Sequence, residues 1–154
     1  MDFLVSHLKS KGKKSSKITD LKNGSVVGYL AFDENKNDVD WIDVRNLYII
    51  PCAQSLGFGT MLIKCIAGLA ISCRKKGVEF NNPFHLPNSA SFYKIRGLKL
   101  IFPNSSIRHR EGCAQLRIFN QDGSLVHHPL LPKSTMHPLE FRKLPTANAA
   151  GLCD

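Results

Sequence analysis

The stretch from Leu47 to Gly77 constrains the fold of this chain more than any other. It begins with a β-branched and aromatic run that stops at Pro51, as a buried strand would. A turn with two glycines follows, and apolar residues then recur at spacings of three and four up to Cys73. This period places the apolar side chains on one face of a helix. The stretch therefore predicts a strand, a glycine-containing turn and an amphipathic helix.

The turn before this helix has a direct chemical use. Gly57 and Gly59 lack a Cβ, so the backbone can come close to a ligand. The helix begins with N–H groups that have no internal partner and with the positive end of its dipole. Both features favour a phosphate or pyrophosphate ligand. The turn is neither a P-loop nor a complete dinucleotide fingerprint, and by itself it is equally compatible with an ordinary strand–helix connection.

A second motif, NSASFYKIRGL, runs from Asn88 to Leu98. Together with QSLGFG at Gln54–Gly59, it resembles the two signatures of the GCN5-related N-acetyltransferases (GNAT), Q/R-x-x-G-x-G/A and N-x-x-A-x-x-F-Y-x-x-x-G-F. The second match is one residue shorter between Ala90 and Phe92, and it ends in leucine where the family has phenylalanine. The resemblance covers residues 18–120.

The resemblance implies a mixed α/β (α+β) fold with a mostly antiparallel central sheet flanked by helices. The residues predict the strands Lys17–Leu21, Ser25–Phe32, Val39–Ile50, Gly77–Phe80, Lys99–Phe102 and Ala114–Phe119, and a short helix from Asn88 to Ile95. The family usually has two helices between its first and second strands, but only about two dozen residues precede Ser25. We therefore expect a reduced N-terminal helical region, with the first strand and at least one helix missing or shortened.

The resemblance also implies a cofactor, acetyl-CoA, whose acetyl group passes directly to an amine. In the family the central strand bulges and splays at the position of Tyr48 and Ile49, where backbone groups bind the pantetheine arm, and the turn amides bind the pyrophosphate. The implied cofactor-binding residues are Leu47, Tyr48, Ile49, Gln54, Ser55, Leu56, Gly57, Phe58, Gly59, Thr60 and Asn88.

Tyr93 and Asp43 are the candidate catalytic residues. The family uses a tyrosine at the position of Tyr93 to protonate the leaving thiolate of CoA or to hydrogen-bond its sulfur. Without that resemblance, a Phe-Tyr pair on a short helix is typical of core packing. Asp43 matches the position of a glutamate that acts as general base in the histone acetyltransferases of the family. Strand geometry places Asp43, Arg45, Leu47 and Ile49 on one face, so Arg45 is expected to pair with Asp43 and to keep its pKa low.

Outside the motifs we expect a basic N-terminal arm at residues 1–17, with a short helix near Asp2–Leu8, and a proline-containing extension at residues 121–154. The acetyltransferase-like domain lies between them. The formal net charge is +9, which suits the phosphates of CoA and leaves contact with nucleic acid open. No apolar run approaches the roughly 20 residues of a membrane helix, and no metal-ligand constellation is present. Five cysteines without a C-x-x-C pair, and no secretory signal, favour free thiols in the cytoplasm.

The leading interpretation is an acetyl-CoA-dependent N-acetyltransferase that acts on a primary amine of a small molecule or a protein. One alternative is an enzyme similar to the toxins that acetylate aminoacyl-tRNA, which the positive charge favours. Another is a non-catalytic module for CoA binding or protein interaction, which the reduced N-terminal region favours. In an enzyme, the reduced N-terminal region would leave the acceptor site more open, or the site would be completed by the C-terminal extension or by a second subunit of a homodimer.

Overall fold

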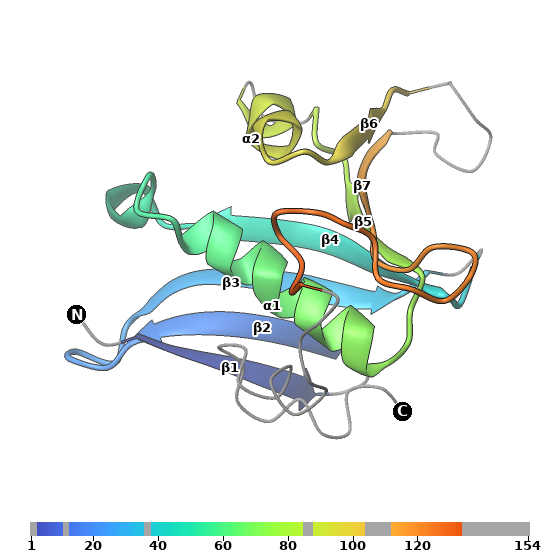
Figure 1. The fold of residues 1–154 in the computed structure, drawn as a ribbon. Helices are drawn as coiled ribbons and strands as arrows, with labels where there is room; N and C mark the ends of the chain where they lie inside the picture. The colour runs from blue at the N-terminus through green and yellow to red at the C-terminus, as the bar shows by residue number, and fades with distance from the viewer. Residues whose placement is uncertain (1–2, 11–12, 36–37, 85–87, 104–111, 134–154) are drawn as a thin grey trace.

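The computed structural model describes residues 3–10, 13–35, 38–84, 88–103 and 112–133. Its elements are β1 (Phe3–Ser10), β2 (Lys13–Asp20), β3 (Val26–Glu34), β4 (Trp41–Ile49), the 3-10 helix η1 (Pro51–Ala53), α1 (Phe58–Ser72), β5 (Gly77–Asn81), α2 (Ser89–Ile95), β6 (Lys99–Ile101) and β7 (Cys113–Arg117). The strands form one seven-stranded sheet in the order β1-β2-β3-β4-β5-β7-β6 (Figure 1). Only the β4–β5 pair is parallel, so the predicted mixed fold with a mostly antiparallel sheet is confirmed.

The N-terminal residues, which we expected to form a basic arm, belong to this sheet. β1 pairs with β2 along its whole length, and β2 pairs with β3. Alternate residues such as Val5, His7 and Ile18 are buried, and the intervening positions are more exposed. The expected helix near residues 2–8 and the expected loss of the first strand are therefore wrong. The described residues before η1 contain no helix, in line with the expected reduction of the N-terminal helical region.

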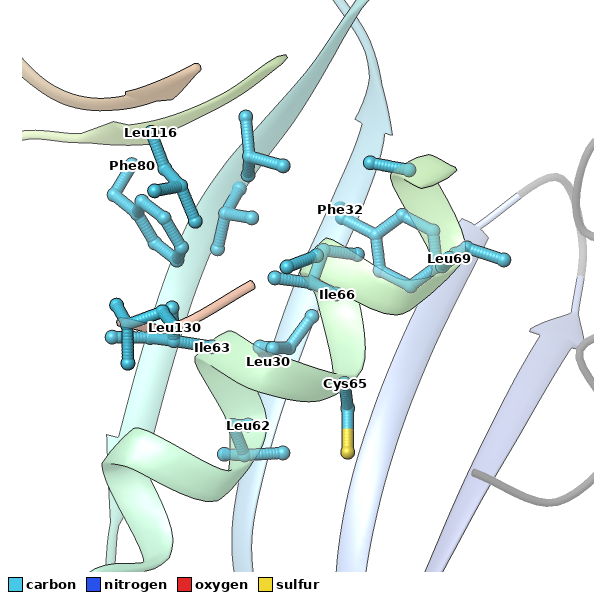
Figure 2. Close-up of a cluster of buried hydrophobic side chains, with 14 of the residues drawn as sticks. Leu30, Phe32, Leu62, Ile63, Cys65, Ile66, Leu69, Phe80, Leu116 and Leu130 are labelled. Carbon is cyan, nitrogen blue, oxygen red and sulfur yellow. The ribbon is translucent and has the colours of Figure 1, made fainter. Parts of the chain in front are cut away.

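Helix α1 lies across one face of the sheet and forms the core with it (Figure 1). Leu62 and Ile66 of α1 are fully buried against β3, where Leu30 and Phe32 face the helix (Figure 2). Burying each such side chain contributes roughly 1.5–3 kcal/mol. This burial holds α1 in place although no side chain caps its N-terminus.

A β-bulge interrupts β4 at Arg45. The cross-strand partner of Ala31 is Asn46 and that of Phe32 is Val44, which leaves Arg45 as the extra residue. The bulge shifts the alternation by one position. Leu47 therefore packs toward the core, like Val44, whereas Asp43 lies on the face opposite α1. Our expectation that Asp43, Arg45, Leu47 and Ile49 share one face is wrong for this reason. We had expected a bulge at Tyr48 and Ile49, and it lies a few residues earlier, at Arg45.

The chain stays on the domain after β7. A β-bridge between Phe119 and Leu125 closes a turn, and Leu130 and Leu131 are then buried in the core. Figure 2 shows Leu130 beside Ile63 of α1. The part of the expected extension that the structure describes, residues 121–133, thus packs along the domain; residues 134–154 lie outside the described residues.

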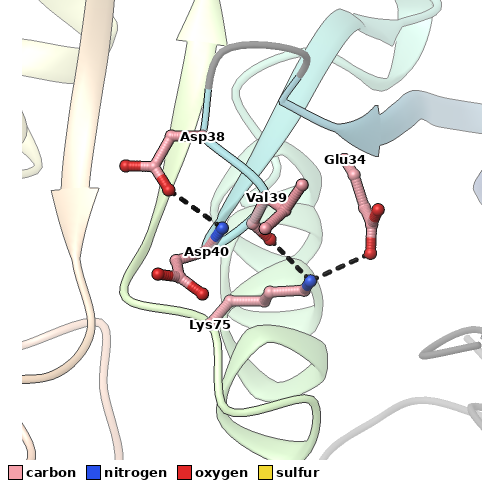
Figure 3. Close-up of polar contacts among 5 residues, drawn as sticks. All are labelled: Glu34, Asp38, Val39, Asp40 and Lys75. Carbon is pink, nitrogen blue, oxygen red and sulfur yellow. Dashed lines mark hydrogen bonds and ion pairs between the residues drawn. The ribbon is translucent and has the colours of Figure 1, made fainter.

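The connection between β3 and β4 is rich in acidic residues and is bound to the segment that follows α1. Nζ of Lys75 donates to Oε1 of Glu34 at 3.0 Å and to the carbonyl of Val39 at 2.7 Å (Figure 3). The hydrogen bond and charge of Lys75 lower the pKa of Glu34. In the same loop, Asp38 accepts a hydrogen bond from the amide of Asp40 at 3.0 Å. These contacts fix the start of β4 relative to the helix.

The described helices include none long and apolar enough to cross a membrane. In the same residues no group of three or more His, Cys, Asp or Glu side chains is placed to hold a metal ion. Cys52 has a free thiol at the surface, but Cys73 is disulfide-bonded, so the expectation of free thiols throughout is wrong.

Candidate cofactor and active site

The site begins where β4 and β5 separate. The two strands pair only over Trp41–Val44 of β4. β4 then continues beside β3, whereas β5 turns away with β7, as Figure 1 shows. On its β5 side the segment Leu47–Ile49 has no strand partner in the described chain. Except for the Ile49 carbonyl, which accepts a hydrogen bond from Nε2 of Gln54 at 3.0 Å, this edge can bind an extended ligand as an added strand would.

The turn after η1 adopts a conformation that few residues can take. Gly57 is the N-cap of α1 and has φ = +91°, in the left-handed region that glycine enters without steric cost. A Cβ at this position would meet no atom within 4 Å, so the backbone conformation alone requires the glycine. Ser55 also has a positive φ, +64°, which costs a non-glycine residue about 1 kcal/mol or more. Such strain is typical of ligand-binding turns.

The first amides of α1 have no hydrogen-bond acceptor in the part of the chain that the structure describes. The N–H groups of Phe58, Gly59 and Thr60 donate to no group in the described chain, and the first bond runs from the Met61 amide to the Gly57 carbonyl at 3.0 Å. The first turn contains no acidic residue. About half a positive charge from the helix dipole is therefore presented at this end, where it favours an anion.

A cleft of about 490 Å³ joins the open edge of β4, the turn and α2. This volume is in the range of small-molecule sites. The cleft is lined by Leu47, Tyr48, Ile49, Ala53, Gln54, Ser55, Gly57, Phe58, Gly59, Asn88, Ser89, Phe92, Tyr93 and Arg96. Most of the site residues predicted from the sequence are thus gathered around one cavity.

Three predicted site residues do not line the cleft. Leu56 is 62% exposed on the turn, and the hydroxyl of Thr60 accepts a hydrogen bond from Nε of Arg96 at 2.7 Å. Asp43 lies on the opposite face of the sheet. Sequence reasoning missed two functional candidates. One is Phe92 on α2, which its place in the second motif could have indicated; the other is Arg96 directly after α2, for which the sequence has no local signal.

Gly59 lies close to another side chain, whereas the sequence had suggested that it leaves room for a ligand. A Cβ on Gly59 would lie 2.8 Å from Cζ of Phe92. The residue is therefore small because α2 packs its aromatic ring against the first turn of α1. This contact fixes the distance between the two helices that form the walls of the cleft.

Tyr93 is positioned by two aromatic contacts. It is 7% exposed, and its ring centroid lies 5.1 Å from that of Phe80 and 5.2 Å from that of Phe92. Its hydroxyl makes no hydrogen bond to another described residue, although Tyr93 lines the cleft. Burial raises the pKa of Tyr93 well above its ordinary value. The phenol therefore stays protonated at neutral pH and can donate a hydrogen bond into the cleft.

Asp43 has a different environment from the one expected. Arg45 pairs with Asp33 at 2.8 Å, and Nδ2 of Asn81 donates a hydrogen bond to Asp43. Burial raises the pKa of Asp43; the Asn81 hydrogen bond opposes this effect, and the nearby Glu79 adds to it. The expectation of a lowered pKa is wrong, because burial outweighs the exposed guanidinium of Arg45. A raised pKa makes Asp43 a stronger base than an ordinary aspartate.

No protein-family model and no curated protein matches the sequence. Solved structures do match the fold. An acetyltransferase of the GNAT family from Staphylococcus aureus Mu50 has a TM-score of 0.58 at 11% identity, over 69% of this chain and 68% of that one. An acyl-CoA N-acyltransferase structure from Klebsiella pneumoniae has a TM-score of 0.57 at 15% identity, over 73% and 77% of the two chains.

A third match is the PaiA N-acetyltransferase of Thermoplasma acidophilum, solved in complex with coenzyme A. Its TM-score is 0.55 at 12% identity, over 67% of this chain and 59% of that one. Identities this low establish the fold alone. This chain therefore has a GNAT-like fold, as its two sequence motifs predicted.

Proposed function

We propose that this protein is an acetyl-CoA-dependent N-acetyltransferase that transfers the acetyl group directly to a primary amine. The observation that carries this proposal is the cleft. In the described residues it combines a strand edge without a strand partner, a helix N-terminus without a side-chain cap and the hydroxyl of a largely buried tyrosine. A thioester linked to a pyrophosphate through an extended arm needs these three features. The likeness to a protein solved with coenzyme A supports the same cofactor.

The cofactor would bind along the cleft from the turn toward α2. The amides of Phe58–Thr60 would hold the pyrophosphate, as helix N-termini do. The edge of Leu47–Ile49, about 10 Å long at strand spacing, would hydrogen-bond the pantetheine arm. Asn88 at the start of α2 also lines the cleft and would contact the arm.

The chemistry requires no covalent enzyme intermediate. The neutral amine attacks the thioester carbonyl, its C–N bond forms, and the C–S bond then breaks to release CoA thiolate. Because a thiol has a pKa of about 8.5, the proton equilibrium favours the phenol of Tyr93. Tyr93 would therefore stabilise the departing sulfur with a hydrogen bond rather than by complete proton transfer.

Asp43 would accept the proton of the amine. It is half-buried near the point where β4 and β5 separate, on the sheet face opposite α1. An aspartate reaches less far than a glutamate, so a bridging water would carry the proton. In the described residues no helix covers this face, and we propose that the acceptor approaches from it.

A panel of amines, incubated with acetyl-CoA while released thiol is measured, tests this proposal. The panel includes polyamines, a lysine peptide and aminoacyl-tRNA, because the basic charge leaves the tRNA substrate open. Thiol release that depends on an amine, and that falls in Tyr93→Phe, is expected. Tight CoA binding without turnover of any amine would instead support the second candidate, a non-catalytic CoA-binding module. That candidate is favoured by the lack of helices over the acceptor face in the described residues.

A further inference from the structure

Among the described residues that line the cleft, Arg96 is the only charged one. It follows the last residue of α2 and points back toward the first turn of α1, where its Nε donates to the hydroxyl of Thr60 at 2.7 Å. The neighbouring amides at the start of α1 have no acceptor among the described residues. A full positive charge and a set of unpaired amides thus lie together at one end of the cleft.

The guanidinium of Arg96 is held in place before any ligand arrives. Besides the bond to Thr60, its Nη1 donates to the Phe92 carbonyl at 2.9 Å, and its Cζ lies 3.7 Å from the centroid of the Phe92 ring. These contacts already order a long side chain, which lowers the entropy cost of a later bond. Nη2 makes no hydrogen bond to the described residues, so one arm of the planar fork remains for a ligand oxygen.

Arg96 also has no carboxylate partner in the described chain. Partial burial lowers the pKa of its guanidinium, because the charged form loses water without gaining a counter-ion. An arginine stays protonated even so. The side chain is thus a partly desolvated cation, and an anion that enters the cleft would bind it more strongly than it would bind an exposed lysine.

We propose that Arg96 is a binding residue for the pyrophosphate of CoA, and that it acts together with the amides of Phe58–Thr60. This inference rests on the proposed function and goes beyond it, because the two sequence motifs assign the pyrophosphate to backbone groups alone. Thr60 and Phe92 act as positioning residues that aim the guanidinium at the helix terminus.

Calorimetric titration of CoA, dephospho-CoA and pantetheine into wild type, Arg96→Gln and Lys94→Gln tests the proposal. Lys94 is a matched control, since it is an exposed cation in the last turn of α2, two residues before Arg96, and does not line the cleft. Losing a charged hydrogen bond should weaken binding of CoA and dephospho-CoA about 10- to 100-fold in Arg96→Gln. Pantetheine, which has no phosphate, should bind equally to all three proteins. Arg96→Lys should recover part of the loss, and Arg96→Gln should reduce the dependence of CoA affinity on salt.

The outcomes distinguish failure of the proposed function from failure of the role of Arg96. If wild type binds no CoA, the proposed function fails and the role of Arg96 fails with it. If wild type binds CoA and Arg96→Gln binds it equally well, only the role of Arg96 is overturned. Equal weakening for pantetheine would also overturn it, because Arg96 would then act only by holding α2 against α1. Weakening confined to CoA, with dephospho-CoA unaffected, would assign Arg96 to the 3′-phosphate and reject the pyrophosphate.

Discussion

Replacement of Gly59 by alanine tests how the two helices of the cleft are held together. A Cβ at this position would lie 2.8 Å from Cζ and 3.0 Å from Cε2 of Phe92. Contacts that short force the ring and α2 to move. Overpacking of this kind costs about 1–3 kcal/mol. Alanine regains up to about 1 kcal/mol of helix propensity, so Gly59→Ala should lower the free energy of unfolding by about 0–2 kcal/mol.

The coupling between Gly59 and Phe92 is the sharper measure. Phe92→Leu removes the ring atoms that the new methyl group would meet, so the double variant should be more stable than the sum of the single changes by about 1–3 kcal/mol. Urea unfolding of the four proteins gives this coupling energy. Gly57→Ala is the control. It should cost about 1–2 kcal/mol through its positive φ, and it should show no coupling to Phe92.

A coupling energy below about 0.5 kcal/mol would refute the packing explanation. If that coupling is absent and Gly59→Ala instead weakens CoA binding, the glycine serves close approach of the ligand, as the sequence alone had indicated.

Further predictions for three residues concern titration and catalysis. Burial lowers the pKa of His7, whose Nε2 has no partner among the described residues. Below the unfolded-state pKa of about 6.5, the unfolded chain therefore binds more protons than the folded one. Stability should fall with decreasing pH by up to about 1.4 kcal/mol per unit, and urea unfolding of His7→Gln should lose this dependence below pH 6.5. Tyr93→Phe should reduce kcat about 10²–10³-fold with CoA affinity unchanged, measured by thiol release and calorimetry; an unchanged kcat would exclude its role at the sulfur. The raised pKa of Asp43 places the acid limb of the rate profile above the ordinary aspartate range, and Asp43→Asn should abolish that limb. The same raised pKa means that the stability contributed by protonated Asp43 is lost as pH rises through that pKa, which urea unfolding against pH would detect by comparison with Asp43→Asn.

The strand, turn and helix at Leu47–Gly77 could be predicted from the sequence because each feature there is local. The apolar period of α1, the glycine at the positive-φ position and the stop at Pro51 act within a few residues of one another. The short helix α2 was predicted for the same reason, from Asn88 and Gly97 at its ends.

The N-terminal strands could not be recognised in the same way. The lysines of β2 read as a solvated arm, yet in the sheet its serine at position 16 and its isoleucine at position 18 are fully buried. These residues form a strand because they pair in register with β1, and the number of charges in a segment does not indicate such pairing. A bulge was expected at Tyr48 and Ile49, but its place at Arg45 was not predicted, because one extra residue leaves no mark on composition and yet reverses the faces of the later residues of the strand.

Two contacts between residues far apart in the sequence could not be predicted from local patterns. Arg96 reaches Thr60 across 36 positions of the chain, and Asp43 meets Asn81 across 38. Neither spacing corresponds to a helix or strand period. Both contacts exist because β4 and β5 pair for only part of their length and α2 then packs on the start of α1.

The central claim is that acetyl-CoA binds along the edge of β4 and at the N-terminus of α1. Backbone amide shifts in a two-dimensional NMR titration of ligand-free protein with acetyl-CoA test it most directly, with ATP as the control. The account predicts that the amides of Leu47–Ile49 and of Phe58–Thr60 shift most, and that ATP leaves Leu47–Ile49 unchanged because it has no pantetheine arm. Shifts confined to other parts of the chain, or no shifts at saturating acetyl-CoA, would contradict it.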